Sequence, residues 1–228
     1  MDSETENATA IAANSATNSI AGDAADSGEN FSDGYTLIPE AVLLAGERVP
    51  VHFGNPFREE EALISGRAFA DLSFFEVLSV SGPDRTKWLH SLTTCSFESL
   101  GTGISAEMLV LSPNGQIEHA AAVIDDGERT WMILDQGKAD GFAQFLCQMK
   151  FMMRVEIARH NFTIIGFGAV LDDVPKELRD SAIFSWQDPW PEIAAGGAHY
   201  GIMPGTHPGA EVKRTLLAFL IKICLRRS

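Results

Sequence analysis

Residues Val77–Asp126 read VLSVSGPDRTKWLHSLTTCSFESLGTGISAEMLVLSPNGQIEHAAAVIDD, and this stretch decides the fold class. The apolar and β-branched run at Phe75–Ser81 predicts a strand. The Gly82-Pro83-Asp84 triplet then predicts a helix start, with proline at the first helical position and aspartate near the positive end of the helix dipole. Trp88, Leu89 and Leu92 recur at the helical period, so one face of this helix is expected to pack on a sheet.

A hairpin follows this helix in the sequence. The Ser112-Pro113-Asn114-Gly115 turn joins two expected strands, Ser105–Leu111 and Gln116–Ile124, because proline presets φ and glycine supplies the positive φ. A second turn at Asp125–Glu128 leads into Arg129–Leu134. The sequence therefore predicts a three-stranded antiparallel meander.

Flanking segments complete an α+β pattern. Asn55-Pro56 predicts a helix start, and Lys138–Met153 reads as an amphipathic helix. Two further strands are expected at Arg154–Ala158 and Phe162–Phe167. Helices that interrupt strands in this way are typical of an antiparallel sheet with packed helices.

The two ends of the chain differ from its middle. Residues 1–33 are polar and acidic and cannot bury enough apolar surface to offset backbone ordering, so we predict a disordered acidic tail. Ser181–Trp186 is compatible with a strand, and Pro189–Gly209 reads as a loop. The apolar stretch Val212–Leu225 is shorter than the roughly 20 residues of a membrane span, so none is expected. Two alternatives remain for it: a basic amphipathic surface helix, or out-of-frame sequence without functional meaning.

Acidic side chains dominate the charge, with 31 Asp and Glu against 17 Lys and Arg and a formal net charge of −14. This balance disfavours a non-specific grip on nucleic-acid phosphates, so no nucleic-acid partner is expected. The three cysteines form no CxxC pair and no disulfide framework, which is typical of a reducing cytoplasm. The first 33 residues contain seven acidic side chains and no Lys or Arg, the opposite of a signal or transit peptide.

The nucleophilic and metal-binding residue types give no clear site. Cys95 follows an expected helix end, where partial negative charge raises a thiol pKa, so no reactive nucleophile is expected there. Cys147 lies beside Leu146 on an amphipathic helix and is expected to pack like a small hydrophobic residue. The six histidines include no i, i+4 pair and no Cys/His cluster at zinc-ligand spacing, so no metal site is predicted.

The run from Asp71-Leu72-Ser73 to Ile124 resembles the folate-binding T-protein family, which includes the glycine cleavage aminomethyltransferase and the YgfZ-like proteins. An Asp-x-Ser lead-in, a Gly-x-Asp helix start, a Leu-x-Thr helix end and a glycine-turn hairpin carry the resemblance, at Asp71, Ser73, Gly82, Asp84, Leu92, Thr94 and Leu111–Gly115. The segments WLHSLTT and LVLSPNGQIEH are similar in sequence to the YgfZ-like proteins found in actinobacteria. The resemblance covers roughly residues 50–170.

The resemblance implies an α+β fold of three subdomains around a central channel that holds tetrahydrofolate. Residues 34–172 would then form a T-protein-like folate-binding domain, and residues 173–228 an incomplete second subdomain with an atypical basic and apolar end. YgfZ-like members use folate in the maintenance of iron–sulfur enzymes, including those that modify tRNA. They are not known to transfer an aminomethyl group.

Two departures from the family pattern bear on function. Family members follow Leu-x-Thr with Asn-Asp, whose aspartate faces the folate, whereas Cys95 and Ser96 stand there in this chain. The Lys-Gly-Cys-Tyr-x-Gly-Gln-Glu motif of YgfZ-like proteins and the C-terminal barrel are absent. The change of composition after Gly209-Ala210 leads us to expect a truncated or frame-shifted product, which translation of the downstream DNA in three frames would test.

Glu107 and Glu118 are the candidate folate contacts. Strand alternation places Glu107 on one face with Ser105, Leu109 and Leu111, and this row is expected to be buried. A buried carboxylate needs a partner, and pterin rings offer N–H donors. The alternative for both glutamates is a solvent-facing position.

Three classes of function remain open, and the sequence assigns no catalytic residue. The first is a YgfZ-type folate-binding accessory protein with iron–sulfur enzymes as partners. The second is an aminomethyltransferase of one-carbon metabolism, and the third is a non-catalytic interaction domain without a ligand.

Overall fold

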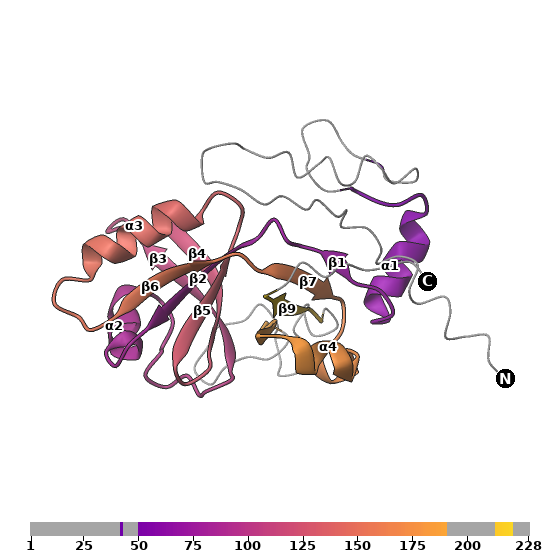
Figure 1. Cartoon of the computed structure of the whole chain (residues 1–228). Coiled ribbons are helices and arrows are strands. Elements are labelled where there is room, and N and C mark those ends of the chain that lie inside the picture. The colour runs from indigo at the N-terminus through magenta and orange to yellow at the C-terminus, as the bar shows by residue number, and fades with distance from the viewer. Residues whose placement is uncertain (1–41, 43–49, 191–212, 221–228) are drawn as a thin grey trace, which may run out of the picture.

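Two antiparallel sheets with helices on their outer sides form the part of the chain that the computed structural model describes, namely Val42, residues 50–190 and residues 213–220 (Figure 1). The acidic tail expected at residues 1–33 and most of the loop expected at residues 189–209 lie outside these ranges. In chain order the elements are α1 (Pro56–Ile64), β1 (Ala70–Asp71), β2 (Glu76–Ser81), α2 (Arg85–Leu92), β3 (Ser105–Leu111), β4 (Ile117–Asp125), β5 (Arg129–Leu134), α3 (Ala139–Met149), β6 (Glu156–His160), β7 (Thr163–Phe167), the 3₁₀ turn η2 (Leu171–Asp173), α4 (Lys176–Ser181), β8 (Phe184–Gln187) and β9 (Thr215–Phe219).

The first sheet contains five strands in the order β3-β4-β5-β2-β6, and the second contains four in the order β1-β7-β9-β8. All strand pairs are antiparallel. The predicted α+β class and the predicted β3-β4-β5 meander are therefore confirmed. Long-range pairing then adds β2 and β6 beside the meander.

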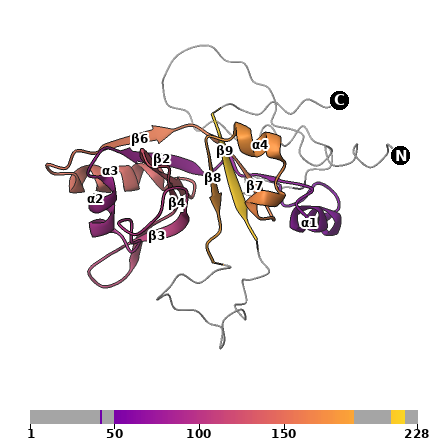
Figure 2. The same ribbon diagram turned by 90° about the horizontal axis from the view of Figure 1, so that it is seen from below.

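Three buried clusters divide the molecule into layers. One lies between the five-stranded sheet and the helices α2 and α3, and another lies between the two sheets. The third lies on the outer face of the four-stranded sheet, towards α4. The two sheets therefore pack face to face, and Figure 2 shows the four-stranded sheet between the five-stranded sheet and α4.

The Gly82-Pro83-Asp84 triplet fixes the end of β2 to the start of β6. Gly82 has φ +110°, and an added Cβ would lie 2.2 Å from the Arg154 carbonyl oxygen, so only glycine fits there. The Asp84 carboxylate accepts hydrogen bonds from the Arg154 backbone N–H and guanidinium. Helix α2 begins at Arg85, so the expectation that Pro83 is the first helical residue is wrong and Pro83 belongs to the preceding turn.

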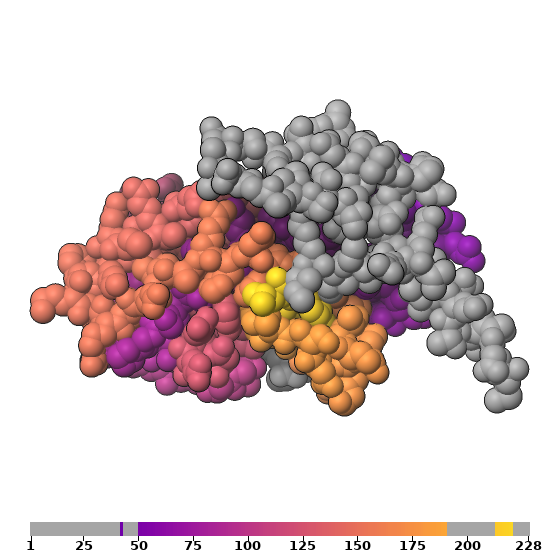
Figure 3. All heavy atoms as spheres, in the orientation of Figure 1, coloured from indigo at the N-terminus to yellow at the C-terminus, as the bar shows by residue number. Residues whose placement is uncertain are grey.

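Strand β9 corrects the expectation for the C-terminal apolar stretch. Thr215–Phe219 is not a surface helix, because it is a strand that lies between β7 and β8 and all five of its residues are buried (Figure 2). On the face shown in Figure 3, the yellow residues 213–220 form only a small patch. The division of the chain at residue 172 remains a prediction, but strands from both sides of it share one sheet.

A substitution in β9 tests its structural weight. Leu217 is fully buried, so Leu217→Ala is expected to lower the free energy of unfolding by about 2–5 kcal/mol through lost packing and a residual cavity. Leu220→Ala, at an exposed position three residues later, serves as the control with little expected change. Urea unfolding measures both, and equal stability of Leu217→Ala and wild type would contradict the central position of β9.

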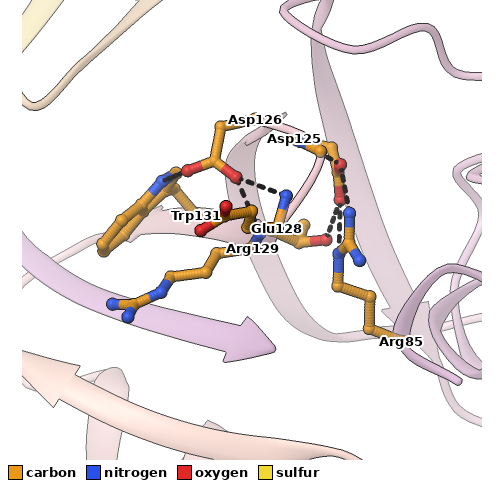
Figure 4. A network of polar contacts seen from close by, with 8 residues as sticks. Arg85, Asp125, Asp126, Glu128, Arg129 and Trp131 are labelled. Atoms are coloured by element: carbon orange, nitrogen blue, oxygen red, sulfur yellow. Dashed lines mark hydrogen bonds and ion pairs between the residues drawn. The ribbon is translucent and has the colours of Figure 1, made fainter. Parts of the chain in front are cut away.

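A buried ion pair attaches α2 to the β4–β5 hairpin (Figure 4). Arg85 donates two hydrogen bonds to the Asp125 carboxylate, at 3.0 and 2.7 Å, and both side chains are mostly buried. The carboxylate also accepts from the Thr130 hydroxyl at 2.6 Å and the Gly127 backbone N–H at 2.9 Å. Burial by itself raises the pKa of Asp125, but these hydrogen bonds outweigh burial and the pKa is lowered.

The depressed pKa of Asp125 predicts a pH dependence of stability. The stabilisation is complete above the pKa of an unfolded aspartate, about 3.9, and is lost as the pH falls through the lower folded pKa. Asp125→Asn is expected to lower stability at pH 7 by about 3–5 kcal/mol, because Arg85 stays buried without a counter-charge. It should also weaken the acid dependence, whereas Asp173→Asn at an exposed position should not. Urea unfolding between pH 2 and 7 measures this, and parallel profiles for Asp125→Asn and wild type would refute it.

Candidate functional site

A cavity of about 200 Å³ opens between the two sheets near the end of β5. Strands β3 and β4 supply its floor and residues of β8 and β9 supply the opposite wall. Its lining is mostly apolar or aromatic, with three charged side chains, and comprises Phe75, Glu107, Met108, Leu109, Ala120, Ala121, Ala122, Ile133, Leu134, Asp135, Trp186, Arg214 and Leu216.

Glu107 lies at this cavity, although not in the way its sequence pattern suggested. The expectation that its face of β3 is buried is wrong, because the buried row is the opposite one, with Met108 and Val110, and Glu107 itself is exposed. The face of β3 that carries Glu107 points towards the four-stranded sheet and borders the cavity there. Its Oε2 accepts a hydrogen bond from the Trp190 indole N–H at 2.5 Å.

Glu118 lies near the outer end of β4 and is exposed. It is absent from the lining of the cavity, and the structure does not bring it to Glu107. The two glutamates predicted from the sequence therefore do not converge on one site.

The wall opposite Glu107 contains two residues that the sequence analysis did not select. Trp186 is almost fully buried, and its indole N–H donates to the Ala106 carbonyl oxygen at 2.9 Å. The Arg214 guanidinium lies 5.2 Å from the Trp186 ring centre and pairs with Asp188 at 3.2 Å. The sequence alone did not point to Trp186 or Arg214 as site residues. They are brought together only by the pairing of β8 with β9, which no local sequence pattern predicts.

Cys95 and Ser96, at the position of the family's Asn-Asp, do not line the cavity. Cys95 is buried in the core beneath α2, and burial raises the pKa of its thiol to about 11. Ser96 is exposed, and its hydroxyl accepts a hydrogen bond from the Ser99 hydroxyl at 2.8 Å. The expectation that Cys147 is packed in a core is wrong, because its side chain is exposed on α3.

A second hollow of about 520 Å³ lies where the chain crosses between the sheets, and Phe75 lines both hollows. Its charged groups already have partners, since Arg159 pairs with Glu76 and Asp140. His160 also lines it and is hydrogen-bonded to the Ser79 hydroxyl at 2.8 Å, and burial lowers the pKa of this histidine. We therefore place the candidate site at the first cavity, where no described cation pairs with the Glu107 carboxylate.

Within residues 50–190 and 213–220, no three His, Cys, Asp or Glu side chains gather as a metal ion requires. No helix of the described part of the chain is long and apolar enough to cross a membrane.

Comparison with known proteins supports a fold for this chain but does not show its activity. No family model matches the chain. An aminomethyltransferase of Chromobacterium violaceum is 30% identical over 77 residues, which are 33% of this chain and 21% of that protein. A chloroplastic protein of Arabidopsis thaliana named as a transferase is 37% identical over 71 residues, which are 30% of this chain and 16% of that protein.

The crystal structure of the glycine cleavage system aminomethyltransferase T from Bartonella henselae superposes with a TM-score of 0.55 at 15% identity and covers 79% of this chain. The chain has the T-protein fold. The predicted α+β T-protein fold is thereby confirmed, and part of the chain is similar in sequence to an aminomethyltransferase. The chain spans 50% of that solved T-protein, and the matched segments span about a fifth or less of the two curated proteins.

Folate is the cofactor that the resemblance to T-proteins leads us to expect, and the cavity suits part of it. A carboxylate that accepts N–H donors and apolar, aromatic walls suit the flat, polar-edged pterin ring. The volume of about 200 Å³ is below the roughly 300–1,000 Å³ of pockets that enclose a drug-sized ligand, so the cavity suits the ring alone.

The two described cysteines are predicted to differ in reactivity. At pH 8, iodoacetamide should alkylate the exposed Cys147 rapidly and leave Cys95 unmodified until the protein unfolds, because Cys95 is buried with a thiol pKa near 11. Peptide mass spectrometry with and without urea measures this, with Cys147→Ser as the control that removes the rapid modification of the peptide containing that residue. Equal labelling of both cysteines in the native protein would contradict the buried position of Cys95.

Proposed function

We propose that this chain is a cytoplasmic folate-binding accessory protein of the YgfZ type, acting in iron–sulfur cluster maintenance and tRNA modification. The observation that carries the proposal is Glu107 at the cavity between the two sheets of a T-protein fold. In this proposal the partners are tetrahydrofolate and iron–sulfur enzymes. Tetrahydrofolate, when bound, would supply a carrier of one-carbon units.

The proposed binding mode follows from the cavity lining. The Glu107 carboxylate accepts an N–H of the pterin ring, a charge-assisted hydrogen bond that is stronger than a neutral one. Phe75 offers aromatic surface to the ring, and the alanines of β4 leave room for it. The rest of the cofactor would extend out of the cavity.

The absence of the family aspartate favours an accessory role over catalysis. Cys95 is buried with a raised pKa, and Ser96 is a neutral hydroxyl that lies outside the cavity lining. Neither can supply a carboxylate to a bound folate. We therefore propose binding without aminomethyl transfer.

Glu107→Gln tests the proposal directly. Glutamine still accepts a hydrogen bond, so only the difference between a charged bond of roughly 1.5–3 kcal/mol and a neutral bond of about 0.5–1.5 kcal/mol is lost, and tetrahydrofolate binding is expected to weaken by about tenfold. Glu118→Gln removes the second predicted contact, and little change is expected because Glu118 does not line the cavity. Isothermal titration calorimetry measures the three dissociation constants, and unchanged affinity in Glu107→Gln would reject the assignment.

An aminomethyltransferase is the second candidate, favoured by the match to the Chromobacterium violaceum enzyme. A glycine cleavage assay with the carrier protein separates it from the accessory role, because only the enzyme would turn over. A chain that shows no heat of binding with tetrahydrofolate would instead fit the third class, an interaction domain without a ligand.

A further inference from the structure

The indole N–H of Trp190 donates a hydrogen bond to one of the two oxygens of the Glu107 carboxylate. This N–H lies 2.5 Å from Glu107 Oε2, while no described residue donates a hydrogen bond to Oε1. Both side chains are exposed, so the contact is not a by-product of core packing. A long acidic side chain at an exposed position would otherwise sample several rotamers.

The backbone around Trp190 is itself fixed to the cavity wall. Asp188 Oδ1 accepts a hydrogen bond from the Trp190 backbone N–H at 3.0 Å. Asp188 Oδ2 pairs with the Arg214 guanidinium at 3.2 Å. The Asp188 backbone N–H donates to the Arg214 carbonyl oxygen at 2.9 Å, which continues the pairing of β8 with β9. Arg214 in turn lies over the Trp186 ring. Trp190 is therefore anchored independently of Glu107.

We infer that Trp190 is a positioning residue for ligand recognition by Glu107. The inference rests on the proposed function and adds to it the group that orients the carboxylate. With Oε2 bonded to the indole, the side chain is ordered before the ligand arrives and Oε1 is left for one N–H donor of a planar heterocycle. Pre-ordering a flexible side chain increases affinity because its entropy is not lost on binding.

The geometry also accounts for the choice of tryptophan. An indole N–H donates but cannot accept, so it pairs with an ionised carboxylate without changing its charge. A lysine or arginine there would neutralise Glu107 and weaken its attraction for ligand donors. Trp190→Phe keeps an aromatic ring and removes the N–H donor.

A double-mutant cycle tests the inference with tetrahydrofolate as the ligand. Trp190→Phe is expected to weaken binding about three- to tenfold in the wild-type background, the effect of one ordered side chain, and less than twofold in the Glu107→Gln background. Trp88→Phe is the matched control, because Trp88 is buried and its indole donates to the Met149 carbonyl oxygen. It should lower the melting temperature and leave the affinity unchanged.

NMR of the ligand-free protein tests the contact separately. The indole N–H signal of Trp190, assigned by its loss in Trp190→Phe, is expected to shift in Glu107→Gln. Unchanged or tighter binding in Trp190→Phe, an equal loss in both backgrounds, or an unshifted indole signal would overturn the positioning role and leave folate binding by Glu107 intact. Absence of tetrahydrofolate binding to the wild type would overturn the proposed function and the inference with it.

Discussion

The face-to-face packing of the two sheets is the constraint on which the cavity depends. Trp131 of β5 stacks on Phe184 of β8 with ring centres 5.0 Å apart, and this contact is part of the apolar cluster between the sheets. Next to Ile133 near the end of β5, the floor is formed by the small side chains Ala120 and Ala122 of β4. Small side chains opposite a bulky wall leave a gap that close packing would otherwise fill.

Among the described residues, Glu107 and Asp135 are the two carboxylates that line the cavity, and neither pairs with a cation. Asp188 neutralises Arg214, and the indole of Trp190 contacts Glu107 without neutralising it. The site therefore keeps a negative group against apolar walls, which suits a ring with N–H donors and disfavours an anion. In contrast, Arg159 has two carboxylate partners at the second hollow. The two hollows therefore differ in charge balance as well as in size.

Local signals in the sequence predicted the elements well, and non-local pairing explains most of what they missed. Glycine and proline punctuation located α2 and the β3–β4 hairpin, because turn chemistry acts over a few residues. Both faces of β3 carry apolar residues, so the sequence could not tell which face α2 and α3 would cover, and the buried row was assigned wrongly. Trp186 and Arg214 meet only through the pairing of β8 with β9, for which no local pattern exists.

Strand β9 gives the molecule an order of assembly. The five-stranded sheet is formed from residues 76–160, a continuous stretch that a growing chain can pair as soon as it is made. The four-stranded sheet must wait, because β7 pairs with β9, and Ile165 meets Leu217 only after the intervening chain has closed into a loop. Until then β7 would present an unpaired edge and a bare apolar face. During synthesis the strands of the first sheet are therefore all available before those of the second, and the second sheet is completed last.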